Sequence, residues 1–189
     1  IIIDGASTDK TLSLIKDRIK KISSLVSEPD NSIYDAMNKG IKIASGEIIG
    51  FLNSDDLYLD NYVLSNVANI FKEDPSLDAC YSDLIYTKRD DTSKVLRYWK
   101  SEKFSKGLFS KGWSPPHPTL FIRSSVYKKF GNFNVRYKIA SDVELMMRFL
   151  EINKIKTMYI PEIWIKMRAG GVSNKNFTNR IKLIMEIIH

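Results

Sequence analysis

The sequence predicts a single-domain α/β protein built on a doubly wound, mostly parallel sheet. The first observation is an apolar run over residues 48–52, which has the length of a buried strand and is followed closely by two adjacent carboxylates, Asp55 and Asp56. The second is that strand-like runs alternate with segments of helical spacing over residues 1–86, in the order β-α-β-α-β-α-β. Parallel strands appear as continuous apolar runs because helices cover both faces of their sheet.

Each element of the first half has its own pattern. The chain opens inside a strand, and apolar residues at helical spacing follow after Ser7, Thr8 or Asp9, any of which can cap a helix. A later helix is stopped by Ser45-Gly46. We expect strands at residues 1–3, 25–26, 48–53 and 79–86, and helices at residues 12–22, 33–44 and 60–72.

The second half is less regular. Three prolines exclude a helix over residues 112–118. The apolar stripe of the tail, residues 176–188, suits a helix packed on the core, which we favour, or a helix lying on an anionic membrane. We expect a hairpin or loop around residues 95–99, strands at 119–122, 158–160 and 163–167, and a helix at 141–152.

Composition narrows the class of partner. The 189 residues carry a formal net charge of +7, which favours an anionic partner. The basic residues are scattered and no nucleic-acid-binding motif accompanies them, so we expect no nucleic acid. No apolar run is long enough to cross a bilayer. The single Cys80 excludes an intramolecular disulfide, and we expect a buried thiol in a reducing cytoplasm.

The acidic pair is the strongest chemical motif. In open α/β sheets ligands bind beyond the carboxyl ends of the strands, which is where Asp55 and Asp56 fall. With Asn53 and Ser54 beside them they offer hard oxygen ligands suited to Mg²⁺ or Mn²⁺. The alternative is that the two acids only end a strand or cap the following helix.

Several short motifs follow one another along the chain. Taken together they resemble family 2 glycosyltransferases of the GT-A fold, especially bacterial enzymes that build surface polysaccharides. The resemblance covers nearly the whole chain. It rests on Ile3-Asp4-Gly5-Ala6-Ser7-Thr8-Asp9, Ile33-Tyr34-Asp35-Ala36-Met37-Asn38-Lys39-Gly40, Asn53-Ser54-Asp55-Asp56, His117-Pro118-Thr119-Leu120-Phe121-Ile122-Arg123, Ala140-Ser141-Asp142-Val143-Glu144-Leu145 and Arg168-Ala169-Gly170-Gly171-Val172-Ser173.

The resemblance implies a sugar transfer from a nucleoside-diphosphate donor, for which we favour a UDP-sugar, to a saccharide or lipid-linked acceptor. Asp56 would ligate the cation, and Asp55 would face the ribose or share the metal. Asp142 would be the general base of an inverting displacement, because such a step needs a carboxylate opposite the leaving diphosphate. The alternative role for Asp142 is to cap a helix.

Six further residues have expected roles in this site. Asp4 would contact the nucleotide, or form a turn; Asp30 and Asn38 would line the same pocket, or belong to a turn and a helix surface. His117 would complete the metal shell or touch the diphosphate, or be an ordinary loop histidine. Trp113 would offer a flat face to a sugar ring, or pack as a half-buried aromatic. Arg168 would approach phosphate oxygens.

Two departures from the family pattern bear on function. Gly5 stands where many relatives have a second acid, and an expected preceding strand and helix of about 30 residues is missing. We therefore expect an N-terminally truncated chain, 1–189, with a nucleotide and metal half at 1–86 and an acceptor half at 87–189. An uncovered sheet edge would favour self-association.

Two alternatives to a glycosyltransferase remain open from the sequence. The chain could be a non-catalytic remnant that binds a nucleotide or a partner without turnover, or it could be a nucleotidyltransferase. We expect a cytoplasmic protein, peripheral at the inner face of the cell membrane.

Overall fold

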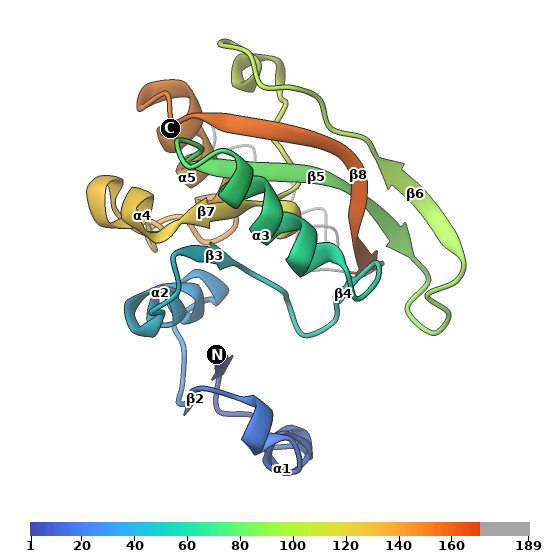
Figure 1. The fold of residues 1–189 in the computed structure, drawn as a ribbon. Coiled ribbons are helices and arrows are strands. Elements are labelled where there is room, and N and C mark those ends of the chain that lie inside the picture. Colours follow the sequence, from blue (N-terminus) through green and yellow to red (C-terminus); the bar gives the residue numbers. More distant parts are fainter. Residues whose placement is uncertain (171–189) are drawn as a thin grey trace.

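The structure, a computed structural model, describes residues 1–170. A six-stranded sheet forms its centre, in the order β3-β7-β5-β8-β4, with β6 paired to β5 outside this path (Figure 1). A separate parallel pair, β1 and β2, packs on α2. The strands are β1 (Ile2–Asp4), β2 (Leu25–Ser27), β3 (Ile48–Gly50), β4 (Leu57–Tyr58), β5 (Ala79–Thr87), β6 (Val95–Trp99), β7 (Phe121–Arg123) and β8 (Thr157–Arg168).

The helices follow the predicted apolar spacing, but the caps expected for the first helix are wrong. Lys10 occupies its capping position and makes no side-chain capping bond, so none of Ser7, Thr8 and Asp9 caps it. Ser32 caps α2, because its hydroxyl accepts a hydrogen bond from the Asp35 amide at 3.2 Å. The predicted helix at 12–22 is divided into α1 and a short 3-10 turn. The helical segments are α1 (Thr11–Lys16), η1 (Ile19–Lys21), α2 (Ile33–Ile43), α3 (Val63–Glu73), η2 (Phe109–Lys111), η3 (His117–Thr119), α4 (Ser124–Phe130), α5 (Ser141–Met147) and η4 (Arg148–Ile152).

Two hydrophobic cores lie on opposite faces of the central sheet. In Figure 1, α3 crosses one face, and its buried residues pack with Leu84, Trp164 and Ile165. The other core joins α2, α4 and α5 to Tyr81 of β5. Alternate residues of β5 enter the two cores, so this strand is buried along nearly its whole length.

The predicted α/β class is confirmed, but the central sheet is mixed rather than mostly parallel. Of its pairings only β5 with β8 is parallel, and a long connection that includes α4 and α5 joins these two strands. β7 and β6 both run antiparallel to β5, along the same edge. A tight hairpin connection produces antiparallel neighbours, whereas parallel pairing needs a crossover. The alternating order of the first half therefore did not fix strand direction.

Some boundaries also differ from expectation. The strands expected at 158–160 and 163–167 are one strand, β8, in which Pro161 and Glu162 fall at a register shift against Ser82 and Asp83. The strand expected through Asn53 ends at Gly50. The patterns did not predict α4 or the short β4. The tail helix expected at 176–188 lies outside the described residues, as do positions 171–173 of the late motif.

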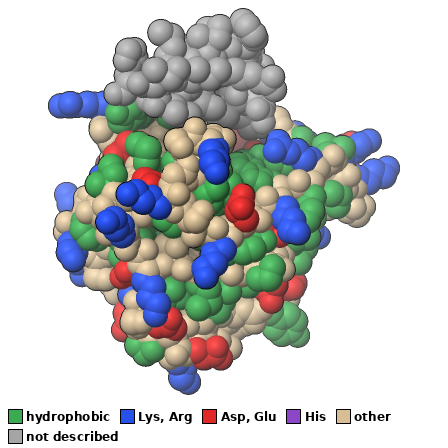
Figure 2. Space-filling model, turned by 90° about the horizontal axis from the view of Figure 1, so that it is seen from above, with side chains coloured by type: hydrophobic (Ala, Val, Ile, Leu, Met, Phe, Trp, Pro, Cys, Tyr) green, Lys and Arg blue, Asp and Glu red, His purple; other side chains and the backbone are tan. Residues whose placement is uncertain are grey.

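The described residues agree with two expectations, a buried Cys80 thiol and scattered basic side chains. Cys80 is fully buried, and burial raises the pKa of its thiol to about 12. On the face in Figure 2, Lys and Arg side chains alternate with apolar and acidic ones and form no continuous basic stripe. Within residues 1–170, no helix has the length and apolar character that crossing a membrane requires.

Candidate active site

The loop after β3 brings the acidic pair to the end of β8. The Asn53 side-chain amide donates to Asp56 Oδ2 at 2.9 Å, and the backbone amide of Arg168 also donates to this carboxylate. Asp56 is only 4% exposed, and its Oδ1 has no hydrogen-bond partner among the described residues. Burial, reinforced by the nearby charge of Asp55, raises the pKa of Asp56 to about 6. A buried carboxylate with a free oxygen is suited to a cation.

Two more polar atoms at this strand end have no partner within residues 1–170. Thr87 closes β5 and pairs with Arg168, the last residue of β8. The Thr87 hydroxyl and the Arg168 Nε are both buried and without a hydrogen bond. Buried polar groups normally find partners, so unpaired atoms at one end of a sheet indicate a place where a ligand supplies them. The structure thus brings the predicted Asp56 and Arg168 together, and adds Thr87.

His117 lies in different surroundings from those expected. Its imidazole packs between Phe51, at 5.8 Å between ring centroids, and Phe133, at 5.5 Å. Burial lowers its pKa, so the ring is neutral near pH 7. Among residues 1–170 no three His, Cys, Asp or Glu side chains form a metal-binding group, so the expected set of Asp55, Asp56 and His117 is not assembled. The prolines around His117 fix its loop in the aromatic core instead.

Asp142 stands in the first turn of α5, beside the same aromatic cluster. Its Oδ1 accepts from the Tyr34 hydroxyl at 3.0 Å and from the Val143 amide at 3.0 Å. The capping position of α5 belongs to Ala140, so Asp142 does not cap the helix as the alternative supposed. The negative charge of Asp142 acts on the His117 imidazole. Residues 51–56 therefore run from the aromatic surroundings of Asp142 to the acidic pair.

Asp4 ends β1 in a fully bonded carboxylate. It accepts from the Ser7 hydroxyl at 2.5 Å, the Ser7 amide at 3.0 Å and the Ser27 hydroxyl at 2.7 Å. The two hydroxyl bonds are the main cause of its lowered pKa. These contacts are the turn-forming role that was the alternative for Asp4, and they also tie β1 to β2.

Asp30 and Asn38 are likewise engaged within the protein. Asp30 pairs with Lys39 at 2.6 Å, and the hydrogen bonds that the Lys39 ammonium donates to Asp30 and Glu28 raise the pKa of Lys39. The Asn38 side chain donates to the Phe133 carbonyl at 2.9 Å and accepts from the Phe133 amide at 3.0 Å. The Nδ2 and Oδ1 atoms of Asn38 therefore both hold the loop that leads to α5.

Trp113 is a half-buried aromatic residue in a wall of rings. Its indole lies 6.2 Å from the Tyr81 ring, 5.9 Å from Phe104 and 5.6 Å from Phe109, measured between centroids. The Nε1 donor of the indole is buried without a partner in the described part of the chain. Trp113 thus retains one polar group for a ligand, although most of its ring is packed.

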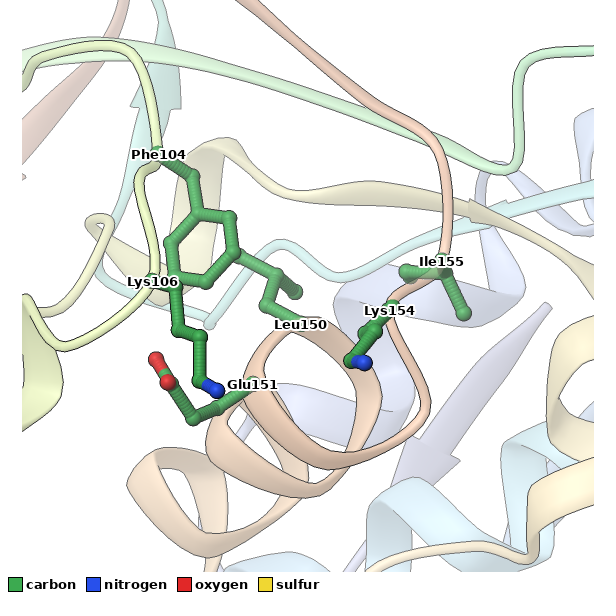
Figure 3. Close-up of a pocket in the computed structure, with 6 residues that line it drawn as sticks. All are labelled: Phe104, Lys106, Leu150, Glu151, Lys154 and Ile155. Atoms are coloured by element: carbon green, nitrogen blue, oxygen red, sulfur yellow. The ribbon is translucent and has the colours of Figure 1, made fainter.

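A separate hollow is lined by none of the site residues that the sequence predicted (Figure 3). Glu151 stands at its edge, but both of its carboxylate oxygens already accept from the Gly107 amide at 3.0 Å. The hollow is lined by Phe104, Lys106, Leu150, Glu151, Lys154 and Ile155. Its one carboxylate, Glu151, is already bonded, so we assign no chemistry to it.

Tyr34 is the residue of this region whose importance the sequence did not indicate. It was part of the helix motif but had no assigned role. Its hydroxyl bridges the Ile139 carbonyl, at 2.5 Å, and Asp142. These partners lie more than 100 positions away, and only the tertiary fold brings them together.

The fold and the acidic pair place the molecule in the class of GT-A glycosyltransferases, as the motifs predicted. Residues 1–138 match the model of glycosyl transferase family 2, and the chain belongs to that family. This membership favours sugar transfer over the nucleotidyltransferase alternative.

Curated relatives are named as glycosyltransferases. A PGL/p-HBAD biosynthesis glycosyltransferase of Mycobacterium bovis is 26% identical over 191 residues, covering 97% of this chain and 72% of the relative. An uncharacterised glycosyltransferase of Rickettsia typhi is 30% identical over 182 residues, covering 93% of this chain and 56% of the relative.

Solved structures share the fold at low identity. S. aureus TarS 1–349 in complex with UDP-GlcNAc matches with a TM-score of 0.67 and 18% identity, over 92% of this chain and 51% of that one. The mannosyltransferase PcManGT of Pyrobaculum calidifontis, in complex with GDP-Man and Mn²⁺, matches with a TM-score of 0.61 and 17% identity, over 95% and 49%. The chain spans about half the length of these structures.

Proposed function

We propose that this chain transfers a sugar from a nucleoside-diphosphate donor to a saccharide or lipid-linked acceptor, with a divalent metal and inversion at the anomeric carbon. The observation that carries the proposal is the buried Oδ1 of Asp56, which has no partner within residues 1–170 and lies beside Asp55 at the end of the sheet in a family 2 chain. A buried carboxylate oxygen without a partner is costly, and a bound cation relieves that cost.

Asp55 and Asp56 are the residues that would hold Mn²⁺ or Mg²⁺. Two carboxylates from one loop suit a cation that takes its other ligands from water and from the donor's diphosphate. When bound, the cation neutralises the charge of the diphosphate as it leaves. His117 is not included in this set, because its neutral ring is buried among Phe51 and Phe133. The Arg168 side chain, whose buried Nε has no partner among the described residues, would face the phosphates.

Asp142 would take the proton of the acceptor hydroxyl as that oxygen attacks the anomeric carbon. The bond from this carbon to the diphosphate oxygen breaks, and its electron pair leaves with the diphosphate. The rings of Phe51, His117 and Phe133 near Asp142 would limit access of water to the reacting atoms. Trp113 would support a sugar ring, with its Nε1 available to a hydroxyl. Asp4, Asp30 and Asn38 would shape the nucleotide side through the turns that they hold.

For the donor we propose a UDP-sugar. Support comes from TarS, whose structures contain UDP and UDP-GlcNAc. The structure of PcManGT contains GDP-Man, so the test below also includes a GDP-sugar.

We also place the reaction in the cytoplasm at the inner face of the membrane, in the assembly of a surface polysaccharide. Flotation of the purified chain with anionic vesicles tests that placement, and recovery only in the pellet would contradict it.

A donor-turnover screen tests the proposed activity. The purified chain is incubated with UDP-GlcNAc, UDP-glucose, UDP-galactose or GDP-mannose, with and without Mn²⁺, and release of UDP or GDP is measured. We expect metal-dependent release from one donor, because water can replace a missing acceptor slowly. We expect Asp142→Asn to reduce the rate by about 10²–10⁴-fold, the usual contribution of a general base. Binding of a nucleotide without release from any donor would instead support the non-catalytic alternative.

A further inference from the structure

Tyr34 occupies a junction between two halves of the site. It lies in the first turn of α2, it is only 6% exposed, and its ring stacks on Phe133 at 5.6 Å. One helical turn later, Asn38 holds the Phe133 backbone through two hydrogen bonds. Positions four apart share one helix face, so α2 contacts the segment before α5 at two points.

Within residues 1–170, two acceptors lie within hydrogen-bond range of the Tyr34 hydroxyl. The Ile139 carbonyl oxygen is 2.5 Å away and Asp142 Oδ1 is 3.0 Å away. A phenol carries one hydrogen, so it cannot donate fully to both acceptors at once. An ionised carboxylate is the stronger acceptor, and a protonated carboxyl is a weaker one. The charge on Asp142 therefore decides which acceptor the hydrogen favours.

We infer that Tyr34 is a positioning residue for the general base Asp142, and that its hydroxyl hydrogen turns from Asp142 to the Ile139 carbonyl as the base takes up a proton. The inference rests on the proposed function. It names a residue to which neither the family motif nor the acidic pair assigns a role.

The exchange adds no proton to the reaction. The acceptor O–H bond breaks and its proton goes to Asp142, while the acceptor oxygen bonds to the anomeric carbon and the diphosphate leaves with the electron pair of the broken bond. Tyr34 keeps its own hydrogen throughout. Because the hydrogen has a partner before and after the transfer, no buried donor is left unpaired in either state. The geometry thus supports the base in both of its charge states.

A double-mutant cycle separates positioning from mere packing. Tyr34→Phe removes the hydroxyl and keeps the ring on Phe133. We expect it to lower kcat for nucleoside-diphosphate release by about 10-fold, with KM for the donor unchanged. In an Asp142→Asn background we expect Tyr34→Phe to have no further effect, because residues that act as a unit are not additive. The control is Tyr127→Phe, which removes another buried phenol hydroxyl from α4 and should leave kcat unchanged.

Three results would overturn the inference. An unchanged kcat in Tyr34→Phe, with an active wild type, would refute it and leave the proposed function standing. An equal loss in both backgrounds would show that Tyr34 only supports the fold. No release by the wild type from any donor in the screen would reject the proposed function and this inference with it. The melting temperature of each variant is recorded beside its kcat, so that a loss caused by unfolding is recognised.

Discussion

At the scale of single residues, Asp4 shows how a side chain typical of a binding site is used for structure. Its carboxylate joins the first turn to β2 through Ser7 and Ser27. The motif over residues 3–9 predicted an acid at the strand end but not how many hydrogen bonds that acid would accept.

We predict that Asp4→Asn lowers the free energy of unfolding at pH 7, measured from the urea midpoint. The folded pKa of Asp4 is lowered by its hydrogen bonds, so its ionised form stabilises the fold above the unfolded carboxyl pKa of about 3.9. That stabilisation is lost as the pH falls through the folded pKa. The difference between wild type and variant should therefore shrink below pH 4. A difference that is constant between pH 7 and pH 3 would contradict this origin.

The pKa shift of Asp56 has the opposite sign to that of Asp4, so its effect on stability also has the opposite pH dependence. Burial raises its folded pKa to about 6, so ionising it costs stability as the pH rises from about 4 to 6. We predict that Asp56→Asn stabilises the metal-free protein at pH 7.5 by about 1–3 kcal/mol and gives no gain at pH 4. Thermal unfolding at the two pH values measures this, with Asp60→Asn, an exposed acid nearby, as control. Destabilisation by Asp56→Asn at pH 7.5 would refute the cost of the buried charge.

At the scale of elements, β3 depends on close approach to β7. Gly50 pairs with Phe121, whose ring occupies the space that a Cβ at residue 50 would need. The apolar run predicted this strand, but the need for glycine comes from a ring 71 positions later in the chain.

We predict that Gly50→Ala destabilises the protein by about 1–3 kcal/mol, because Phe121 must leave its packed position in the core. The urea midpoint measures the effect. Gly46→Ala is the matched control, since a Cβ there would meet only an ordinary contact with the Ile48 carbonyl. Equal midpoints for the two variants would contradict the close packing of Phe121 on Gly50.

Elements were more predictable than their pairing. Periodicity predicted α2, α3 and β5 within a few residues, because their apolar faces are continuous. It missed α4, which is only seven residues long. It could not show that β7 and β6 share one edge of β5, since pairing depends on residues far apart in sequence. For the same reason the acidic pair was predicted, whereas the bond from Tyr34 to Asp142 was not.

At the scale of the whole molecule, the two regions of the site come from different parts of the chain. The acidic pair follows β3, and Arg168 approaches it from the end of β8. Asp142 belongs to α5, and residues 51–56 connect its surroundings to the acids. Family membership supports one catalytic domain, and the proposed division at residues 86 and 87 would place donor and acceptor on its two halves.

The central claim is that Asp55 and Asp56 bind a nucleoside diphosphate through a divalent cation. The most direct test is a thermal-shift titration with UDP and GDP, with and without Mn²⁺, on the wild type and Asp56→Asn. We predict a rise in the melting temperature that needs both nucleotide and metal, equivalent to about 2.7 kcal/mol at 100 times the dissociation constant, and lost in the variant. A nucleotide-dependent rise of equal size without Mn²⁺, or in Asp56→Asn, would contradict the claim, as would no rise with either nucleotide.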